Sequence, residues 1–297
     1  MQSQTEIRAN ITENIVNALR NGIVPWRKPW VGPNSPSFPT NFTSQRSYRG
    51  MNVLLLRLAE MSQNYPTSYW ATFAQWRSVD CFVRAGEKAT QIVFWKPVTK
   101  TKRDDQGDEE SKTFPVLRSW AVFNIAQVEG KIADTFKAIP QPITEVVSDE
   151  RHEEFEKVVV GTKADIRYGG DKAFYVRPPQ DHIVLPQREK FIDFPAFAET
   201  LAHELCHWTE WRLGWTGNYA EGELRAEIGA CFLSTALGIP NSSDLSNHAA
   251  YIHSWLQALE NDPKFIFRAA TAASKAADHI LGLSQPQEAT EPEEVTA

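Results

Sequence analysis

Two histidines four residues apart, with a glutamate directly after the first, constrain this chain more than any other feature. They form the segment His203-Glu204-Leu205-Cys206-His207. Residues four apart on an α-helix project from one face about 6 Å apart, so two imidazoles can bind one cation. The carboxylate between them then points at a water beside that cation. The pattern is typical of the metal-binding helix of zinc hydrolases.

The residues around this segment favour a helix. Asp193 is a suitable N-cap, Pro195 fits the first turn, and apolar residues recur at helical spacing from Phe197 until Gly214 ends the pattern. We therefore expect the histidines inside a long, partly buried helix. Cys206 is rotated away from both histidines by helical geometry, so we interpret it as a packing residue and not a ligand.

The position of the third ligand identifies the kind of site. The extended metzincin motif requires a glycine and a third histidine where this chain has Glu210 and Leu213, so that class is excluded. Twenty residues after His207 comes Glu227, in a second predicted helix from Glu221 to about Leu237. A His, His, Glu set with one open position is the arrangement of catalytic zinc, and this spacing is similar to that of the gluzincins.

Two carboxylates compete for that role, since Glu223 lies one turn before Glu227 on the same helix face. We prefer Glu227 for its spacing and because the small side chain of Ala230 permits close helix approach. His248 and His253 are further candidates, which can also be read as pocket-wall or surface residues. Hydroxyl or imidazole donors for a developing oxyanion are available at Tyr219, Tyr251 and His248, although helix packing also explains the two tyrosines.

The donor types favour a single divalent metal. Two imidazoles and a carboxylate suit Zn²⁺, and Mn²⁺ or Co²⁺ could occupy the same set. The chemistry then predicted is metal-assisted peptide hydrolysis, with Glu204 as general base. In the alternative reading, both histidines are half-buried residues bonded to neighbours and Glu204 is a solvated charge.

Composition describes a globular chain with a sizeable core. The sequence has 297 residues, of which 42% are hydrophobic, and ten are tryptophans. It contains no apolar run long enough to cross a bilayer and no signal-peptide core near Met1, so we expect a cytoplasmic protein without a membrane partner. The cysteines, Cys81, Cys206 and Cys231, are scattered and odd in number, which argues against a disulfide framework.

The net charge of −6 hides an asymmetry between the two halves. Residues 1–130 contain 16 Lys and Arg against 11 Asp and Glu, whereas residues 131–297 contain 15 against 26. Five of the eleven N-terminal acids fall between Thr101 and Lys112, a stretch that we interpret as a solvated loop between strands. The rest of the first half is basic, which favours a polyanionic partner there.

Periodicity predicts an α+β fold with two domains. The expected organisation is an N-terminal domain at 1–130, a proline-containing linker at 131–148, a C-terminal domain at 149–283 and a disordered tail at 284–297. In the first domain we expect helices at 5–21, from about 52 to 62 and at 70–77, and strands at 91–96 and 118–124. In the second we expect helices at 149–160, 246–260 and 263–281, and strands at 164–168, 173–176 and 182–185. His182–Leu185 is the candidate edge strand for an extended peptide.

The N-terminal half interleaves cations with flat side chains, the combination that single-stranded nucleic acid requires. The candidate contacts are Trp26, Arg27, Lys28, Trp30, Arg46, Tyr48, Arg49, Asn52, Lys88 and Lys96. Trp70, Trp76 and Trp95 are expected mainly in the core. Arg49 and Asn52 could instead hold their loop to the following helix.

Several motifs, in order along nearly the whole chain except its tail, resemble the ArdC-type antirestriction proteins. They are Ile23-Val24-Pro25-Trp26, Tyr48-Arg49-Gly50-Met51-Asn52, Trp70-Ala71-Thr72-Phe73-Ala74-Gln75-Trp76, Gly86-Glu87-Lys88-Ala89-Thr90 and His203-Glu204-Leu205-Cys206-His207-Trp208.

The resemblance implies an N-terminal domain that binds single-stranded DNA, which conjugative primase-like proteins also contain, and a C-terminal zincin-like metallopeptidase domain. It further implies a protein of mobile elements, such as conjugative plasmids, that protects entering DNA from host restriction endonucleases, and whose peptidase site has a host protein as a candidate target. The metal and base positions of the family fall on His203, His207, Glu204 and Glu227. Two other readings remain: a protein that protects DNA by occlusion, with a structural or vestigial metal site, and a housekeeping peptidase with an accessory domain.

Overall fold

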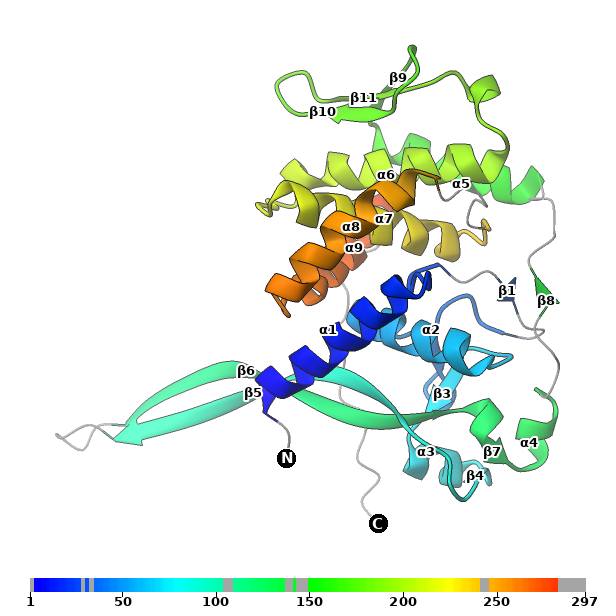
Figure 1. Cartoon of the computed structure of the whole chain (residues 1–297), viewed down its shortest axis with the longest axis vertical. Coiled ribbons are helices and arrows are strands. Elements are labelled where there is room, and N and C mark those ends of the chain that lie inside the picture. The colour runs from blue at the N-terminus through cyan, green and yellow to red at the C-terminus, as the bar shows by residue number, and fades with distance from the viewer. Residues whose placement is uncertain are drawn as a thin grey trace.

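The computed structural model describes residues 3–27, 30–31, 35–103, 109–136, 141–142, 149–240 and 246–282. The expected disordered tail at 284–297 and most of the expected linker lie outside these residues. The chain forms an N-terminal unit (residues 3–136) and a C-terminal unit (residues 149–282), which lie one above the other in Figure 1. This is the expected mixed helix and strand organisation in two parts.

A four-stranded sheet and two helices form the N-terminal unit. The sheet has the order β2 (Thr40–Asn41), β3 (Tyr69–Ala71), β6 (Glu109–Asn124), β5 (Thr90–Arg103). Helix α1 (Gln4–Arg20) starts with a capping box between Ser3 and Glu6, and α2 (Met51–Gln63) packs against β5. Smaller elements complete the unit: α3 (Phe73–Ser78), β4 (Phe82–Val83), η1 (Ile125–Gln127), β7 (Val128–Glu129) and α4 (Lys131–Asp134).

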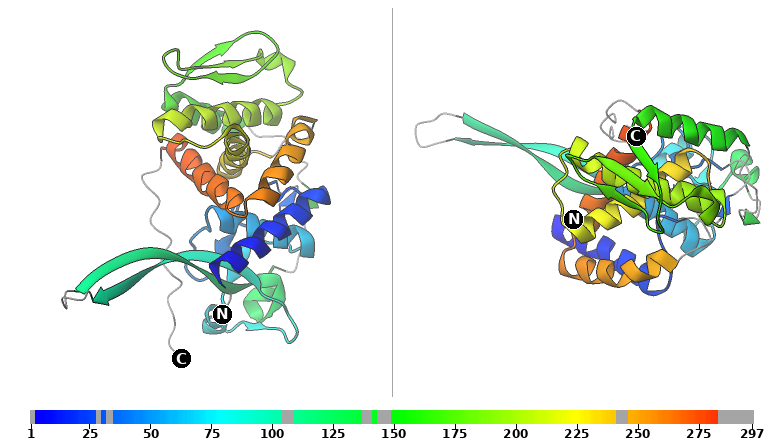
Figure 2. Two further views of the ribbon diagram at one scale, coloured as in Figure 1. Left: turned by 60° about the vertical axis from the view of Figure 1, so that its left-hand side comes forward. Right: turned by 90° about the horizontal axis from the view of Figure 1, so that it is seen from above.

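Strands β5 and β6 form a hairpin much longer than the sequence predicts. Their antiparallel register runs from Thr90↔Val122 to Arg103↔Glu109, and β3 pairs with β6 only near Asn124. The rest of the hairpin is a two-stranded ribbon that projects from the body in all three views (Figures 1 and 2). The expected loop from Thr101 to Lys112 is therefore wrong at both ends, where threonines and serines continue the strands.

The C-terminal unit consists of helices covered on one side by a small sheet. The sheet has the order β10 (Phe174–Val176), β11 (His182–Leu185), β9 (Asp165–Tyr168). The helices are α5 (Asp149–Thr162), α6 (Phe194–Arg212), α7 (Tyr219–Ala236), α8 (Ser246–Asn261) and α9 (Phe265–Ile280), with the short η2 (Arg188–Lys190) before α6. These bounds agree closely with the expected helices. The expected edge strand, however, is the central one, since β11 pairs with β9 in parallel and with β10 in antiparallel orientation.

The two units share one hydrophobic core. The apolar face of α1, including Ile11 and Ile15, belongs to the same buried cluster as Trp255 and Phe265 of the C-terminal unit. In addition, the Thr12 hydroxyl donates to the Pro263 carbonyl at 2.9 Å. Burial of this size couples the stability of the two units.

Three further details differ from the sequence predictions or extend them. The helix expected at 70–77 starts only at Phe73, because Tyr69–Ala71 forms strand β3. Residues 131–136, placed in the linker, pack on the N-terminal unit, where Ala133 joins Trp76 in a buried cluster. The short strands β1 (Trp30–Val31) and β8 (Gln141–Pro142) pair with each other. Within the described residues, no helix is long and apolar enough to cross a membrane.

Candidate metal centre

Helix α6 presents the two histidines as its sequence predicts. The Asp193 side chain accepts from the amide of Ala196 at 2.8 Å, with Pro195 in the first turn. Leu201 and Leu205 are fully buried on the opposite side of the helix. The rings of His203 and His207 therefore share the remaining face, with centroids 4.9 Å apart.

Helix α7 lies against α6 because a glycine and an arginine permit close contact. A Cβ on Gly229 would meet the Cys206 sulfur at 2.6 Å, so only glycine fits that crossing. Buried Arg225 donates to the Cys206 carbonyl at 2.7 Å and also bonds the Thr209 hydroxyl. This packing fixes which side chains of α7 reach the histidines.

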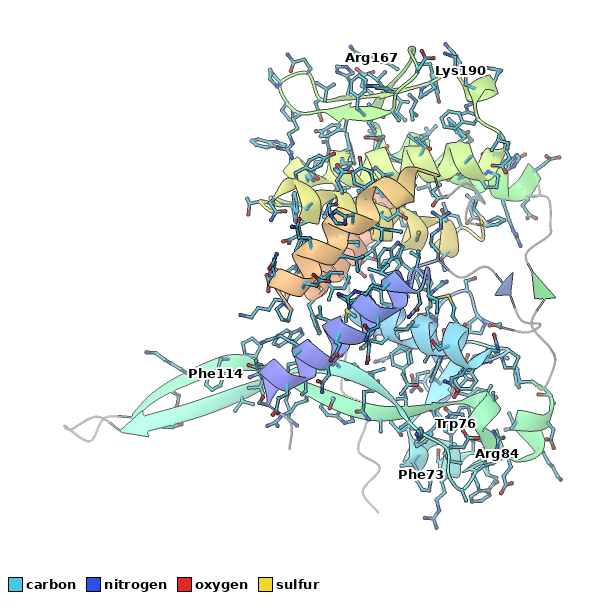
Figure 3. All side chains as sticks on the ribbon, in the orientation of Figure 1. Phe73, Trp76, Arg84, Phe114, Arg167 and Lys190 are labelled. Atoms are coloured by element: carbon cyan, nitrogen blue, oxygen red, sulfur yellow. The ribbon has the colours of Figure 1, made fainter. Side chains whose placement is uncertain are left out.

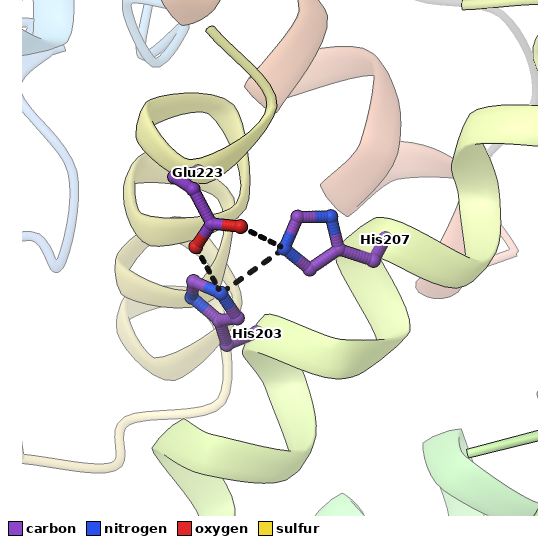
Figure 4. Close-up of side chains that lie close together, drawn as sticks. All are labelled: His203, His207 and Glu223. Carbon is purple, nitrogen blue, oxygen red and sulfur yellow. Dashed lines mark hydrogen bonds and ion pairs between the residues drawn. The ribbon is translucent and has the colours of Figure 1, made fainter. Parts of the chain in front are cut away.

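Glu223 is the carboxylate that α7 brings to the two imidazoles (Figure 4). Nε2 of His203 lies 3.1 Å from Nε2 of His207 and 3.5 Å from Oε2 of Glu223, and Nε2 of His207 lies 3.6 Å from Oε1 of Glu223. Ligand atoms at the corners of a tetrahedron with metal distances of about 2.0–2.1 Å lie about 3.3 Å apart. The two imidazole nitrogens, each facing a different oxygen of the Glu223 carboxylate, thus lie at separations close to those of a divalent-metal site.

The electrostatics of this triangle favour a cation. Burial alone would lower the pKa of His203, but the hydrogen bond to Glu223 and the charges of Glu204 and Glu227 raise it above its ordinary value. Burial alone would raise the pKa of Glu223, but its contacts with both histidines lower it. The carboxylate is held ionised beside two imidazole nitrogens, which is the protonation state a metal ligand needs.

The preference for Glu227 as third ligand stays a prediction, and the geometry favours Glu223 over it. Its Oε1 accepts from Nε1 of Trp26 at 3.4 Å and lies 3.7 Å from Nη1 of Arg27. Glu227 also forms a buried group with Glu199 and Cys231. The Arg27 guanidinium lies beside the carboxylates of Glu199 and Glu227, 2.8 Å from Glu199, and compensates their negative charge. Burial raises the pKa of the Cys231 thiol, which favours its neutral form.

Glu204 lies beside the triangle with its side chain largely buried. Burial is the main reason why its pKa is raised, while His203 and His207 act in the opposite direction. The backbone of Tyr175 in β10 also lies close to this carboxylate and acts to lower its pKa. Edge strand β10 therefore borders the candidate site, the position that the sequence assigned to β11.

Glu210 and Arg177 are site residues that the sequence analysis did not identify. Oε1 of Glu210 accepts from Nδ1 of His207 at 2.8 Å, and Oε2 accepts from Arg177 at 2.9 Å. A carboxylate on the far nitrogen fixes the tautomer that leaves Nε2 free to bind a metal. The signal was present in the sequence, because Glu210 follows His207 by three residues, on the same helix face.

Of the expected oxyanion donors, the structure describes the side chains of Tyr219 and Tyr251. The Tyr219 hydroxyl lies 3.5 Å from that of Tyr251, and the pKa of Tyr219 is raised by this contact first, then by burial and by Glu223. Tyr219 therefore reaches the site through Glu223. His253 is exposed, and the side chain of His248 lies outside the described residues.

The candidate nucleic-acid contacts separate into buried and exposed residues. Trp26 and Arg27 lie under the C-terminal unit, and Asn52 bonds both backbone groups of Val93 at 2.8 Å, so these three are structural. Arg49 pairs with Asp278, and Tyr48 is half-buried with its hydroxyl accepting from Asn41 at 3.3 Å. Arg46, Lys88 and Lys96 are exposed as expected, while Lys28 and the Trp30 side chain lie outside the described residues.

Comparisons with known proteins agree with this architecture. Residues 5–123 match the family described as the N-terminal domain of anti-restriction factor ArdC, and residues 153–272 match the zincin-like metallopeptidase family. Crystal structures of the antirestriction ArdC protein from the R388 plasmid are similar. The metal-free form is 32% identical with a TM-score of 0.74, covering 94% of this chain and 99% of that one. The Mn(II)-bound form is 32% identical with a TM-score of 0.73, covering 93% and 97%.

Two curated relatives have different lengths. The uncharacterized protein y4eC of Sinorhizobium fredii is 33% identical over 292 residues, which cover 93% of this chain and 92% of that protein. DNA primase TraC of Escherichia coli is 35% identical over 308 residues, which cover 93% of this chain but 27% of the primase. This chain thus corresponds to about a quarter of that larger protein.

The fold and the site together define a zincin-like metallopeptidase domain joined to a second domain of the ArdC N-terminal type. The chain belongs to the ArdC family of antirestriction proteins.

Proposed function

We propose that this protein binds single-stranded DNA entering a cell during plasmid transfer and protects it from host restriction endonucleases, with the metal centre acting on a host protein. Its family membership and the basic N-terminal half support this role. The three cysteines are free and buried, which suits the reducing cytoplasm where restriction takes place. The proposed domains are an N-terminal one, extended from the expected 1–130 to residue 136, and a C-terminal one at 149–283. These ranges include the family matches at 5–123 and 153–272.

The observation that carries the hydrolytic part is the triangle of His203, His207 and Glu223, whose donor atoms are separated by 3.1–3.6 Å. We assign these three as metal ligands, with Zn²⁺ as the first choice and Mn²⁺ or Co²⁺ as substitutes. A divalent ion held there would lower the pKa of a water at its open position and polarise a substrate carbonyl.

Glu204 is the general base in this proposal. Burial raises the pKa of its carboxyl above the ordinary value, so it can accept a proton from the attacking water and later give it to the leaving amine. Its contact with the Tyr175 backbone holds it at the edge of the sheet, where an extended peptide can pair with β10. Tyr219 is the candidate donor to the developing oxyanion, through its position beside Glu223.

Replacing the base tests the proposal. Glu204→Gln keeps the size of the side chain and leaves the three ligand atoms unchanged, so the variant should fold and bind metal like the wild type. We expect plasmid transfer into a restricting host to fall to the level seen without the protein, and a trapped host protein to co-purify with the variant.

The same variant separates the alternative role. If Glu204→Gln protects entering DNA as well as the wild type does, the protein acts by occlusion and its metal centre is structural. Transfer into a host that lacks restriction endonucleases is the control, since neither form should alter it.

A further inference from the structure

The hairpin of β5 and β6 has two chemically different faces. Side chains alternate along each strand, and the register places directly opposed residues on the same face. One face, called here the basic face, carries Phe94, Lys96, Val98, Lys112, Phe114, Val116, Arg118 and Trp120. The other, called the threonine face, carries Trp95, Pro97, Thr99, Thr101, Ser111, Thr113, Pro115 and Leu117.

The contacts confirm this division. On the threonine face, the hydroxyls of Thr99 and Thr113 lie 2.7 Å apart and those of Thr101 and Ser111 lie 2.8 Å apart. On the basic face, the rings of Phe94 and Trp120 meet edge to face, with centroids 5.5 Å apart.

Charge is distributed unequally between the faces. The two strands contain six Lys and Arg against two Glu. The register continues the basic face through the positions of Lys100 and Lys102, so that five of the six cations fall on it, with Glu110 opposite Lys102. The sixth, Arg103, stands opposite Glu109 on the other face. A strand pair selected only for solubility has no need to gather its cations on one side.

The body of the protein covers the threonine face at its base. Leu117 is buried in the shared core, its amide donates to the Gln4 side chain at 3.0 Å, and the Arg8 guanidinium lies 5.3 Å from the centre of the Trp95 ring. Lys96 and Lys112 of the basic face are exposed, and Phe114 and Arg118 are partly exposed. Figure 3 shows Phe114 on the projecting part of the hairpin.

We propose that the basic face of the hairpin is a binding track for single-stranded DNA. Lysines and arginine meet the phosphates, and the partly exposed Phe94, Phe114 and Trp120 offer flat surfaces on which bases stack. Cations and aromatic rings on one face suit a flexible polyanion whose bases can stack. An acidic protein surface would use the cations but not the rings. The inference rests on the proposed function and supplies a site in place of the buried Trp26 and Arg27.

The acidic tip limits the track. Glu109 and Glu110 end the described part of β6, and phosphates are repelled there. The track therefore runs from the base of the hairpin, at Trp120, to the level of Lys112. The eight steps from Lys112 to Trp120, at about 3.4 Å each, make the track about 27 Å long.

Fluorescence anisotropy of a labelled oligothymidylate with the full-length protein tests this proposal. Lys96→Gln with Lys112→Gln removes two positive charges from the basic face. For single strands, each phosphate contact contributes about 0.7 to the slope of the logarithm of the binding constant against the logarithm of the salt concentration. Loss of two contacts should therefore reduce this slope by about 1.4 and the affinity by about 25-fold at about 0.1 M salt. Phe114→Ala should weaken binding by roughly five- to hundredfold without changing the slope.

The matched control adds two negative charges to the opposite face. Thr101→Glu with Thr113→Glu changes the net charge by the same amount and should leave affinity within about threefold. All variants should keep the wild-type circular dichroism and melting temperature, because these side chains lie on the projecting ribbon. Equal losses in both double variants would mean that only the overall charge matters, and the track would be rejected.

Two other outcomes separate this inference from the function on which it rests. If the wild type binds the oligonucleotide and the basic-face variants bind equally well, the DNA site lies elsewhere and the proposed function stands. If the wild type binds no single-stranded DNA at any salt concentration, both proposals fail.

Discussion

Glu223 and Glu227 illustrate how neighbouring residues of one type acquire different roles. They lie one turn apart on α7, yet Glu223 faces two imidazoles and Glu227 faces Trp26 and Arg27. The first carboxylate is poised to bind a metal, whereas the second compensates a buried guanidinium. The distinction is measurable, because loss of a ligand and loss of a buried ion pair have different consequences.

Glu223→Gln should weaken metal binding by more than about a hundredfold, which exceeds the 10–100-fold cost of losing an outer partner of a ligand. Glu227→Gln should retain the metal but lower the free energy of unfolding by about 1–3 kcal/mol, since Arg27 loses a charged partner. Metal content after dialysis and urea denaturation measure the two effects. The reverse pattern, with metal lost only from Glu227→Gln, would restore the assignment made from the sequence.

The sequence predicts the part of the site that lies within one helix. His203, Glu204 and His207 have fixed relative directions once α6 is known, so periodicity alone aligns them. Glu223 and Glu227 differ by about 40° of rotation and 6 Å of rise on α7. The choice between them depends on how α7 is rotated against α6, which is set by Gly229 and Arg225 and is not encoded in a spacing.

At the scale of elements, the crossing of α6 and α7 positions the candidate centre. Gly229 is the contact point, and its conformation is ordinary helix, so the requirement for glycine is one of space. An added methyl group would have to displace the Cys206 sulfur, which is itself fully buried two positions after Glu204. Moving α6 and α7 slightly apart would therefore change the distances between the two histidines and Glu223.

Gly229→Ala should lower the free energy of unfolding by about 1–3 kcal/mol through overpacking and should also weaken metal affinity. The control is Gly161→Ala in α5, where nothing lies within 4 Å of an added Cβ. That change should be neutral or stabilising by up to about 1 kcal/mol, since alanine is the better helix former. Urea denaturation and metal titration of both variants measure the difference; equal behaviour would show that the helix crossing does not set the site.

Helices were predictable to within a few residues, but the hairpin and the sheet order were not. Helices α1, α6 and α7 begin at side-chain N-caps, and the helical segments carry many apolar residues, whereas the outer hairpin has alternating polar residues with no buried face. Nothing local in Thr99–Arg103 distinguishes a ribbon strand from a loop. The central place of β11 likewise follows from pairing with distant β9 and β10, which no single segment determines.

At the scale of the whole molecule, a loop that the sequence suggested for DNA contact instead joins the two units. Trp26 packs edge to face on Trp255 with centroids 5.8 Å apart, and Arg27 pairs with Glu199 of α6. Basic and aromatic composition could not reveal this, because Glu199 lies 172 residues after Arg27 and Glu227 lies 201 residues after Trp26. The peptidase-like unit is thus partly held in place by the N-terminal unit.

Arg27→Ala should therefore destabilise both units together. Removing one partner of a buried ion pair costs about 3–5 kcal/mol, because the carboxylates of Glu199 and Glu227 stay buried. Arg20→Ala, which breaks an exposed pair with Glu260, is the control and should cost at most about 1 kcal/mol.

Pulsed alkylation in urea reports on each unit separately, since buried Cys81 lies in the N-terminal unit and buried Cys206 in the C-terminal unit. The shared core predicts that both thiols become reactive at one urea concentration, and that Arg27→Ala lowers this concentration equally for both. Exposure of Cys206 at a clearly lower concentration than Cys81, in either protein, would show that the units unfold independently and that the buried loop does not couple them.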